Sequence, residues 1–100
     1  SKLQLDQTKL DLENIINQAW NDAKAAIKAH EAAQKTLEAR QLAYEYSKER
    51  FDVGLMNAFD FSQAQSRLDN AQAEVIRTKF DYIFRVKVLE FYFGLPIELK

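Results

Sequence analysis

The stretch from residue 49 to residue 68, ERFDVGLMNAFDFSQAQSRL, decides the fold, because it interrupts helix-forming sequence once near the middle of the chain. From residue 3 to residue 52 there is no glycine or proline, and Ala, Leu, Glu, Lys and Gln predominate, so one helix is predicted over about 3–52. Gly54 can adopt the left-handed conformation that ends a helix. Asn57 can then cap a second helix, with Asp60 three residues later as in a capping box.

The second helix is predicted over about 58–93, where Gly94 and Pro96 are expected to end it and to leave a tail at 94–100. Residues 53–57 form the tip between the helices. A connection this short makes the two helices antiparallel neighbours. The predicted fold class is therefore all-α, and the 100 residues form one domain, a long antiparallel two-helix coiled-coil hairpin.

Each helix carries two apolar series with the alternating four- and three-residue spacing of a coiled coil. In the first helix the first series is Leu12, Ile16, Ala19, Ala23, Ala26, His30, Ala33 and Leu37. Its second series, on a neighbouring face, is Ala25, Ala29, Ala32, Thr36, Ala39, Ala43 and Tyr46. The second helix has Phe61, Ala64, Leu68, Ala71, Val75 and Tyr82 in its first series, and Ala73, Ile76, Phe80 and Ile83 in its second. Two faces predict neighbours on both sides, as in a ring of helices, although a broad apolar face in an ordinary bundle is an alternative.

The two helices differ in length, so part of the first helix lacks an intrachain partner. Residues 1–16 are expected to overhang, with the apolar side chains Leu5, Leu10, Leu12, Ile15 and Ile16. The far end of the second helix is aromatic around much of its circumference, with Phe80, Tyr82, Phe84, Phe91, Tyr92 and Phe93. We therefore expect the chain to be part of a larger assembly. The excised chain is expected to dimerise, with the overhang packed on the aromatic segment of the other copy.

The composition excludes several classes of function. With 14 basic and 15 acidic residues interleaved and a net charge of −1, the chain lacks the basic face that nucleic acid or anionic lipid requires. No apolar run reaches the roughly 18 residues of a membrane-spanning helix, and no phosphate loop or catalytic motif is present. His30 is the only histidine and falls in the first series, so we interpret it as a polar residue that fixes register. We predict no enzyme, no metal site and no cofactor.

The motifs around the tip occur in a specific order. A helix ends with Phe51, Val53 and Gly54, and the next helix opens with the pattern formed by Asp60, Phe61, Ala64, Gln65 and Leu68. The segment FDYI follows, and then Leu89 and Gly94. Over residues 35–96 this order resembles the TolC family of outer-membrane efflux channels.

The resemblance implies a homotrimer with a β-barrel in the outer membrane and a hollow α-barrel that crosses the periplasm. Each subunit of such a channel contributes two repeated helical hairpins to the α-barrel, and this chain corresponds to the second, C-terminal one. It is then a passive export conduit in the periplasmic part of a Gram-negative outer-membrane protein. Its implied partners are a periplasmic adaptor (membrane fusion) protein and an inner-membrane pump.

The resemblance also implies roles for residues at the tip. Val53, Gly54 and Leu55 correspond to the turn that docks the adaptor. Asp60 matches an aspartate that contributes to an acidic ring facing the pore. A helix-capping role for Asp60 is an equally open reading and does not exclude the ring.

Three gate positions depart from the family pattern. Where relatives carry a tyrosine, an arginine and a second aspartate, this chain has Phe51, Met56 and Gln63. A polar latch built from those groups is therefore not expected. The alternative to a channel segment is a stand-alone helical interaction module, including an adaptor-type hairpin whose own tip docks onto a channel.

Overall fold

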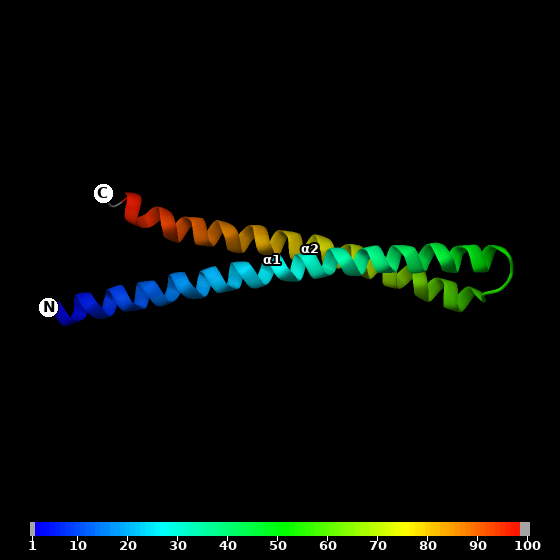
Figure 1. Cartoon of the computed structure of the whole chain (residues 1–100), viewed down its shortest axis with the longest axis horizontal. Helices are drawn as coiled ribbons and strands as arrows, with labels where there is room; N and C mark the ends of the chain where they lie inside the picture. Colours follow the sequence, from blue (N-terminus) through cyan, green and yellow to red (C-terminus); the bar gives the residue numbers. More distant parts are fainter. Residues whose placement is uncertain (1, 99–100) are drawn as a thin grey trace.

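The computed structural model describes residues 2–98, with side chains described up to Gly94. It contains two helices, α1 (Lys2–Asp52) and α2 (Ala58–Glu98), which run antiparallel as an extended hairpin (Figure 1). The hairpin measures 78 × 22 × 14 Å. Within residues 2–98 there is no strand, and the predicted all-α hairpin is confirmed.

A glycine turn ends α1. Gly54 has a φ of 82°, in the left-handed region. The amide of Leu55 donates to the carbonyl of Arg50 at 2.7 Å, and the amide of Gly54 donates to the carbonyl of Phe51 at 3.1 Å. These two bonds form a Schellman motif, which satisfies carbonyl groups that the helix end would otherwise leave without partners.

Asn57 caps the start of α2. Its Oδ1 accepts a hydrogen bond from the amide of Asp60 at 2.8 Å, and its Nδ2 donates to the Asp60 carboxylate at 3.3 Å. The carbonyl of Asn57 accepts the first helical hydrogen bond, from the amide of Phe61 at 3.1 Å. The Asp60 charge also lies in the first turn, where the helix dipole favours an anion.

The end of α2 differs from the prediction. We expected the helix to stop near residue 93 and a tail to follow, but α2 continues to Glu98 through Gly94 and Pro96. Among the described glycines only Gly54 has a positive φ, so Gly94 keeps a right-handed helical backbone. Glycine permits a helix stop without imposing one, whereas a proline removes one donor and clashes with the carbonyl four residues earlier, a cost that α2 bears two residues from its end. Residues 99 and 100 of the predicted tail lie outside the described residues.

The first series of each helix forms the contact between α1 and α2. The buried side chains of the described part are Ala23, Ala26, Ala33, Leu68, Ala71, Thr78 and Leu89. Most members of the two first series that are not fully buried are half-buried along the same contact. Alanines on α1 let the helix axes approach closely, and no large described side chain is fully buried. The core is therefore a thin seam between two helices.

The second series lie on the outer surface. Every member of the second series of α1 and of α2 is exposed, and Tyr46, Ile76 and Phe80 are more than half exposed. Neither series is covered by the other helix of the hairpin. The prediction of two separate apolar faces on each helix is thus confirmed, and only one of the two faces packs against the other helix.

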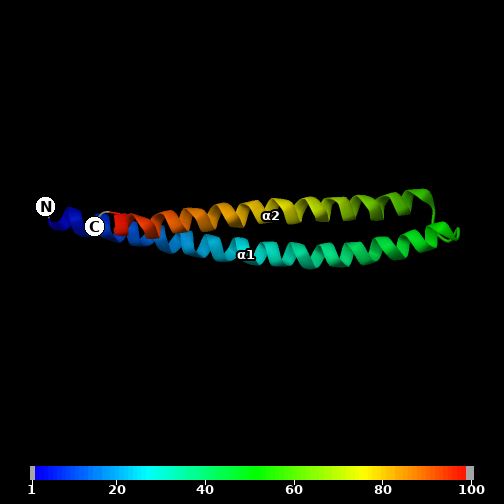
Figure 2. The same cartoon turned by 90° about the horizontal axis from the view of Figure 1, so that it is seen from above.

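The helices diverge toward the two termini (Figure 1), and α1 projects beyond α2 (Figure 2). Leu5, Leu10 and Leu12 are exposed as predicted for an overhang. Ile16, which we expected to lack a partner, is half-buried, in a stretch of α1 whose residues Ile15 and Ala19 share a groove with Val88 and Tyr92 of α2. The overhang is therefore shorter than the sequence predicts.

Candidate functional site

The tip presents three large apolar side chains to solvent. Val53 and Leu55 lie in the turn and are 70% and 69% exposed, and Phe59 on the first turn of α2 is 69% exposed. A Cβ placed on Gly54 would meet no atom within 4 Å, so the backbone of the turn is also open to a partner. Sequence reasoning missed Phe59. The available signal was an aromatic residue next to the tip that belongs to neither apolar series of α2.

Aromatic stacking supports the tip from inside the hairpin. The ring of Phe51 stacks on the ring of Phe61, with centroids 4.6 Å apart and an interplanar angle of 11°. Tyr44 lies on the same Phe61 ring at 5.6 Å. Phe51, a gate position that departs from the family pattern, is therefore part of an apolar stack. With the caps on both helices, this stack holds the exposed tip in one conformation.

Asp60 lies on the rim of a groove between the helices, next to the tip. The groove has a volume of about 260 Å³ and is also lined by Met56 and Gln63, the other two departing gate positions, and by Arg40 and Arg67. In the described part of the chain none of these residues forms an ion pair. The Asp60 carboxylate accepts a hydrogen bond from the side chain of Asn57, the residue that caps α2.

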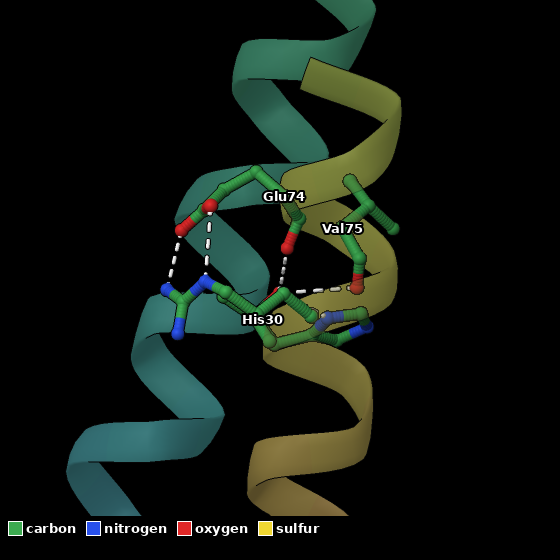
Figure 3. A network of polar contacts seen from close by, with 5 residues as sticks. His30, Glu74 and Val75 are labelled. Atoms are coloured by element: carbon green, nitrogen blue, oxygen red, sulfur yellow. Dashed lines mark hydrogen bonds and ion pairs between the residues drawn. The ribbon is translucent and has the colours of Figure 1, made fainter. Parts of the chain in front are cut away.

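A polar contact joins the two helices in the middle of the seam. The Nδ1 atom of His30 lies 3.0 Å from the Oγ1 of Thr78, and the rings of His30 and Tyr82 are 5.1 Å apart. Figure 3 shows His30 reaching the turn of α2 at Glu74 and Val75. The hydroxyl of Thr78 lies 2.8 Å from the carbonyl of Glu74 and 3.1 Å from that of Val75. In the Nδ1–H tautomer, His30 donates to the Thr78 hydroxyl, and the hydroxyl proton goes to one of these carbonyls.

Ion pairs lie on the surface of α2. Arg85 lies 3.6 Å from Asp22 of α1 and 3.3 Å from Asp81 of its own helix. Glu74 and Arg77 form a two-point contact, and the hydrogen bond from Arg77 lowers the pKa of the exposed Glu74 carboxyl. Exposed pairs of this kind contribute little to stability.

Neither a metal centre nor a membrane span emerges from the described residues. Residues 2–94 bring no three metal-binding side chains together. Within the described residues, neither α1 nor α2 contains a stretch that is apolar enough to cross a bilayer. What remains as a candidate site is the capped, stacked and apolar tip, on a hairpin that leaves one apolar face of each helix uncovered.

The described residues form a two-helix hairpin with an exposed apolar tip, which places the chain in the class of long antiparallel helical hairpins. The particular family follows from comparison: the family model described as "Outer membrane efflux protein" matches residues 1–94. The chain belongs to this family, which confirms the resemblance seen around the tip. It is a family of transport proteins and not of enzymes. No curated protein and no solved structure matches the chain.

Proposed function

We propose that the chain is a periplasmic α-barrel segment of an outer-membrane efflux channel, and that it corresponds to the C-terminal of two repeated hairpins. In the full-length protein it forms part of a homotrimer and acts as a passive export conduit. The observation that carries this proposal is the second apolar series, which has the periodicity of a helix contact and is exposed on both α1 and α2.

The two exposed series differ in side-chain size, which supports helical neighbours on both sides. On α1 the second series consists mainly of alanine, whereas on α2 it includes Ile76, Phe80 and Ile83. Small residues let a neighbouring helix approach closely, and bulky residues fill the space at such a contact. Apolar area left in water forgoes about 25 cal/mol per Å², so both faces favour burial against further helices.

The tip docks a periplasmic adaptor protein in this proposal, with an inner-membrane pump as the third component. Val53 and Leu55 supply apolar contacts, Gly54 supplies the turn and an accessible backbone, and Phe59 adds a third large side chain. The capping hydrogen bonds and the stack of Phe51 on Phe61 support this role, because a preorganised surface loses little entropy on binding.

Asp60 contributes an acidic ring at the periplasmic entrance in the same proposal. Repeated by the trimer symmetry, such a ring favours cations over anions. Arg40 and Arg67 line the same groove as Asp60. The electrostatic potential near Asp60 therefore depends on the positive charges of the two arginines as well as on the negative charge of the carboxylate. The proposed capping and ring roles of Asp60 use the same carboxylate.

Leu55→Asp in the full-length channel tests the docking role. We expect export and co-purification of the adaptor to fall by about tenfold or more, because a charge replaces an apolar contact at the centre of the tip. Leu55→Met, which keeps an apolar side chain, is the matched control. Normal export by Leu55→Asp at an unchanged outer-membrane level would rule the tip out as the adaptor contact.

A further inference from the structure

One side of the hairpin carries two arginines that no carboxylate of the described chain neutralises. Arg40 of α1 and Arg67 of α2 both line the groove next to the tip, and both line the groove that adjoins it toward the middle of the hairpin. Neither arginine forms an ion pair among the described residues. We refer to Arg40 and Arg67 as the arginine pair. It lies between the two grooves, with one member from each helix.

The missing partner distinguishes Arg67 from the other arginines of α2. Arg77 is paired with Glu74, and Arg85 is paired with two aspartates. Glu74 is the carboxylate that lines the second groove, but it is bonded to Arg77 and not to the arginine pair. Because like charges repel each other, an anion from outside the hairpin would stabilise the arginine pair.

The arginine pair lies on the same face of the hairpin as Asp60. Asp60, Gln63 and Arg67 follow one another on α2 at spacings of three and four residues and line one groove, which Arg40 reaches from α1. Seven residues separate Asp60 from Arg67, roughly 10 Å along the helix axis. This separation is close to the Debye length of about 8 Å at physiological salt, so the two levels act as neighbouring but distinct charges. A compartment that Asp60 faces is therefore faced by the arginine pair as well.

We infer that the arginine pair forms a basic ring in the pore beside the acidic ring of Asp60, and that this basic ring binds oxyanion groups of exported molecules. The inference rests on the proposed channel, in which the trimer symmetry repeats both rings. Guanidinium groups bind carboxylate and phosphate through paired hydrogen bonds. Thr36 and Asn70 line the second groove and offer further donors to the same oxygens. A molecule that enters at the tip passes the acidic ring first and the basic ring second.

Reversal potentials of the full-length channel, measured in a planar bilayer under a gradient of potassium chloride, test the basic ring. We expect Arg40→Gln/Arg67→Gln to raise the permeability of potassium relative to chloride by about twofold or more, because the charge of Asp60 then dominates this level. Asp60→Asn should shift the ratio the opposite way. Arg40→Lys/Arg67→Lys keeps both charges and should keep the wild-type ratio. Lys35→Gln, at an exposed lysine of α1 that lines neither groove, should leave the ratio unchanged.

Inorganic phosphate tests whether the arginine pair binds an oxyanion or only contributes charge. We expect phosphate to reduce the chloride current of the wild-type channel, and Arg40→Gln/Arg67→Gln to require about tenfold more phosphate for the same reduction. Arg40→Lys/Arg67→Lys should fall between the two, because lysine keeps the charge but lacks the forked geometry of a guanidinium group. Equal reduction in the wild type and in the glutamine variant would overturn the binding site.

The permeability ratios separate a failure of this inference from a failure of the proposed function. An unchanged ratio in Arg40→Gln/Arg67→Gln, together with a shift in Asp60→Asn, would overturn the basic ring and leave the channel in place. An equal shift in Lys35→Gln would also overturn the basic ring, because the effect would then not depend on this face of the hairpin. A wild-type protein that forms no conducting pore would overturn the proposed function, and the basic ring with it.

Discussion

Thr78 is the residue at which the seam fixes the register of the two helices. It is the only buried polar side chain among the described residues, at 3% exposure. Its hydroxyl donates to a carbonyl of its own helix and accepts from His30, so its hydrogen-bonding capacity is used. A sliding of α1 along α2 would separate His30 from Thr78 and leave both groups facing alanine or aliphatic side chains. Polar residues inside a coiled-coil seam commonly specify register in this way.

His30→Ala tests this interpretation. We expect the free energy of unfolding to fall by about 1 to 2 kcal/mol, because the hydrogen bond to Thr78 and the ring contact with Tyr82 are both lost. His30→Asn, which can still donate a hydrogen bond, is expected to recover part of the loss. Urea unfolding followed by circular dichroism measures both changes. Unchanged stability in His30→Ala would show that the seam alanines set the register without the polar contact.

The two glycines have opposite roles, and replacing each of them with alanine distinguishes these roles. Gly54→Ala is expected to lower the free energy of unfolding by about 1 kcal/mol or more, since a side chain at a φ of 82° is strained. Gly94→Ala is expected to raise it by about 0.5 to 1 kcal/mol, because Gly94 is helical and its added Cβ would meet nothing within 4 Å. Thermal unfolding measures both variants. A stabilising Gly54→Ala would contradict the glycine turn, and a destabilising Gly94→Ala would contradict the helical continuation of α2.

At the scale of elements, the sequence predicted the two helices and their contact well. Alternating three- and four-residue spacing identified the face of each helix that is buried, because burial between two helices imposes this period, but the predicted series of α2 omitted the buried Thr78 and Leu89. The tip residues followed from local chemistry: Gly54 is in the left-handed region and Asn57 caps α2. The adaptor and pore roles of Val53, Leu55 and Asp60 depend on partners outside the chain and stay predictions.

The errors of the sequence prediction lie where local signals compete. Gly94 and Pro96 both favour a helix stop, yet α2 passes through them and ends two residues after the proline. Phe59 is exposed at the tip but was missed, because a search for periodic apolar residues passes over a single one outside the series.

Substitutions at two adjacent alanines test which face of α1 packs against α2. Ala33 is buried against α2, and Ala32 lies in the exposed second series. Ala33→Leu is expected to destabilise the hairpin by about 1 to 3 kcal/mol through overpacking. Ala32→Leu should leave the stability of the hairpin unchanged and should impair assembly of the full-length channel. Chemical unfolding of the hairpin and crosslinking of the channel measure the two effects. If Ala33→Leu and Ala32→Leu destabilised the hairpin equally, this result would contradict the separation of a buried and an exposed face on α1.

At the scale of the whole molecule, the hairpin has little core for its length. Its radius of gyration is 22.2 Å, whereas about 13 Å is typical of a compact domain of 100 residues. The fully buried alanines of α1 lie between residues 23 and 33, opposite the buried residues of α2 between 68 and 89. Toward the termini the helices diverge and large apolar side chains are exposed. Stability is therefore distributed unevenly along two helices that look continuous.

Amide hydrogen exchange should reveal this uneven distribution. Helical hydrogen bonds open most readily where few tertiary contacts hold them, so residues 2–15 of α1 are expected to exchange fastest and residues 23–37 slowest in dilute solution. Uniform exchange along α1 would mean that its helix is stable without the seam, and that burial does not determine where this hairpin opens.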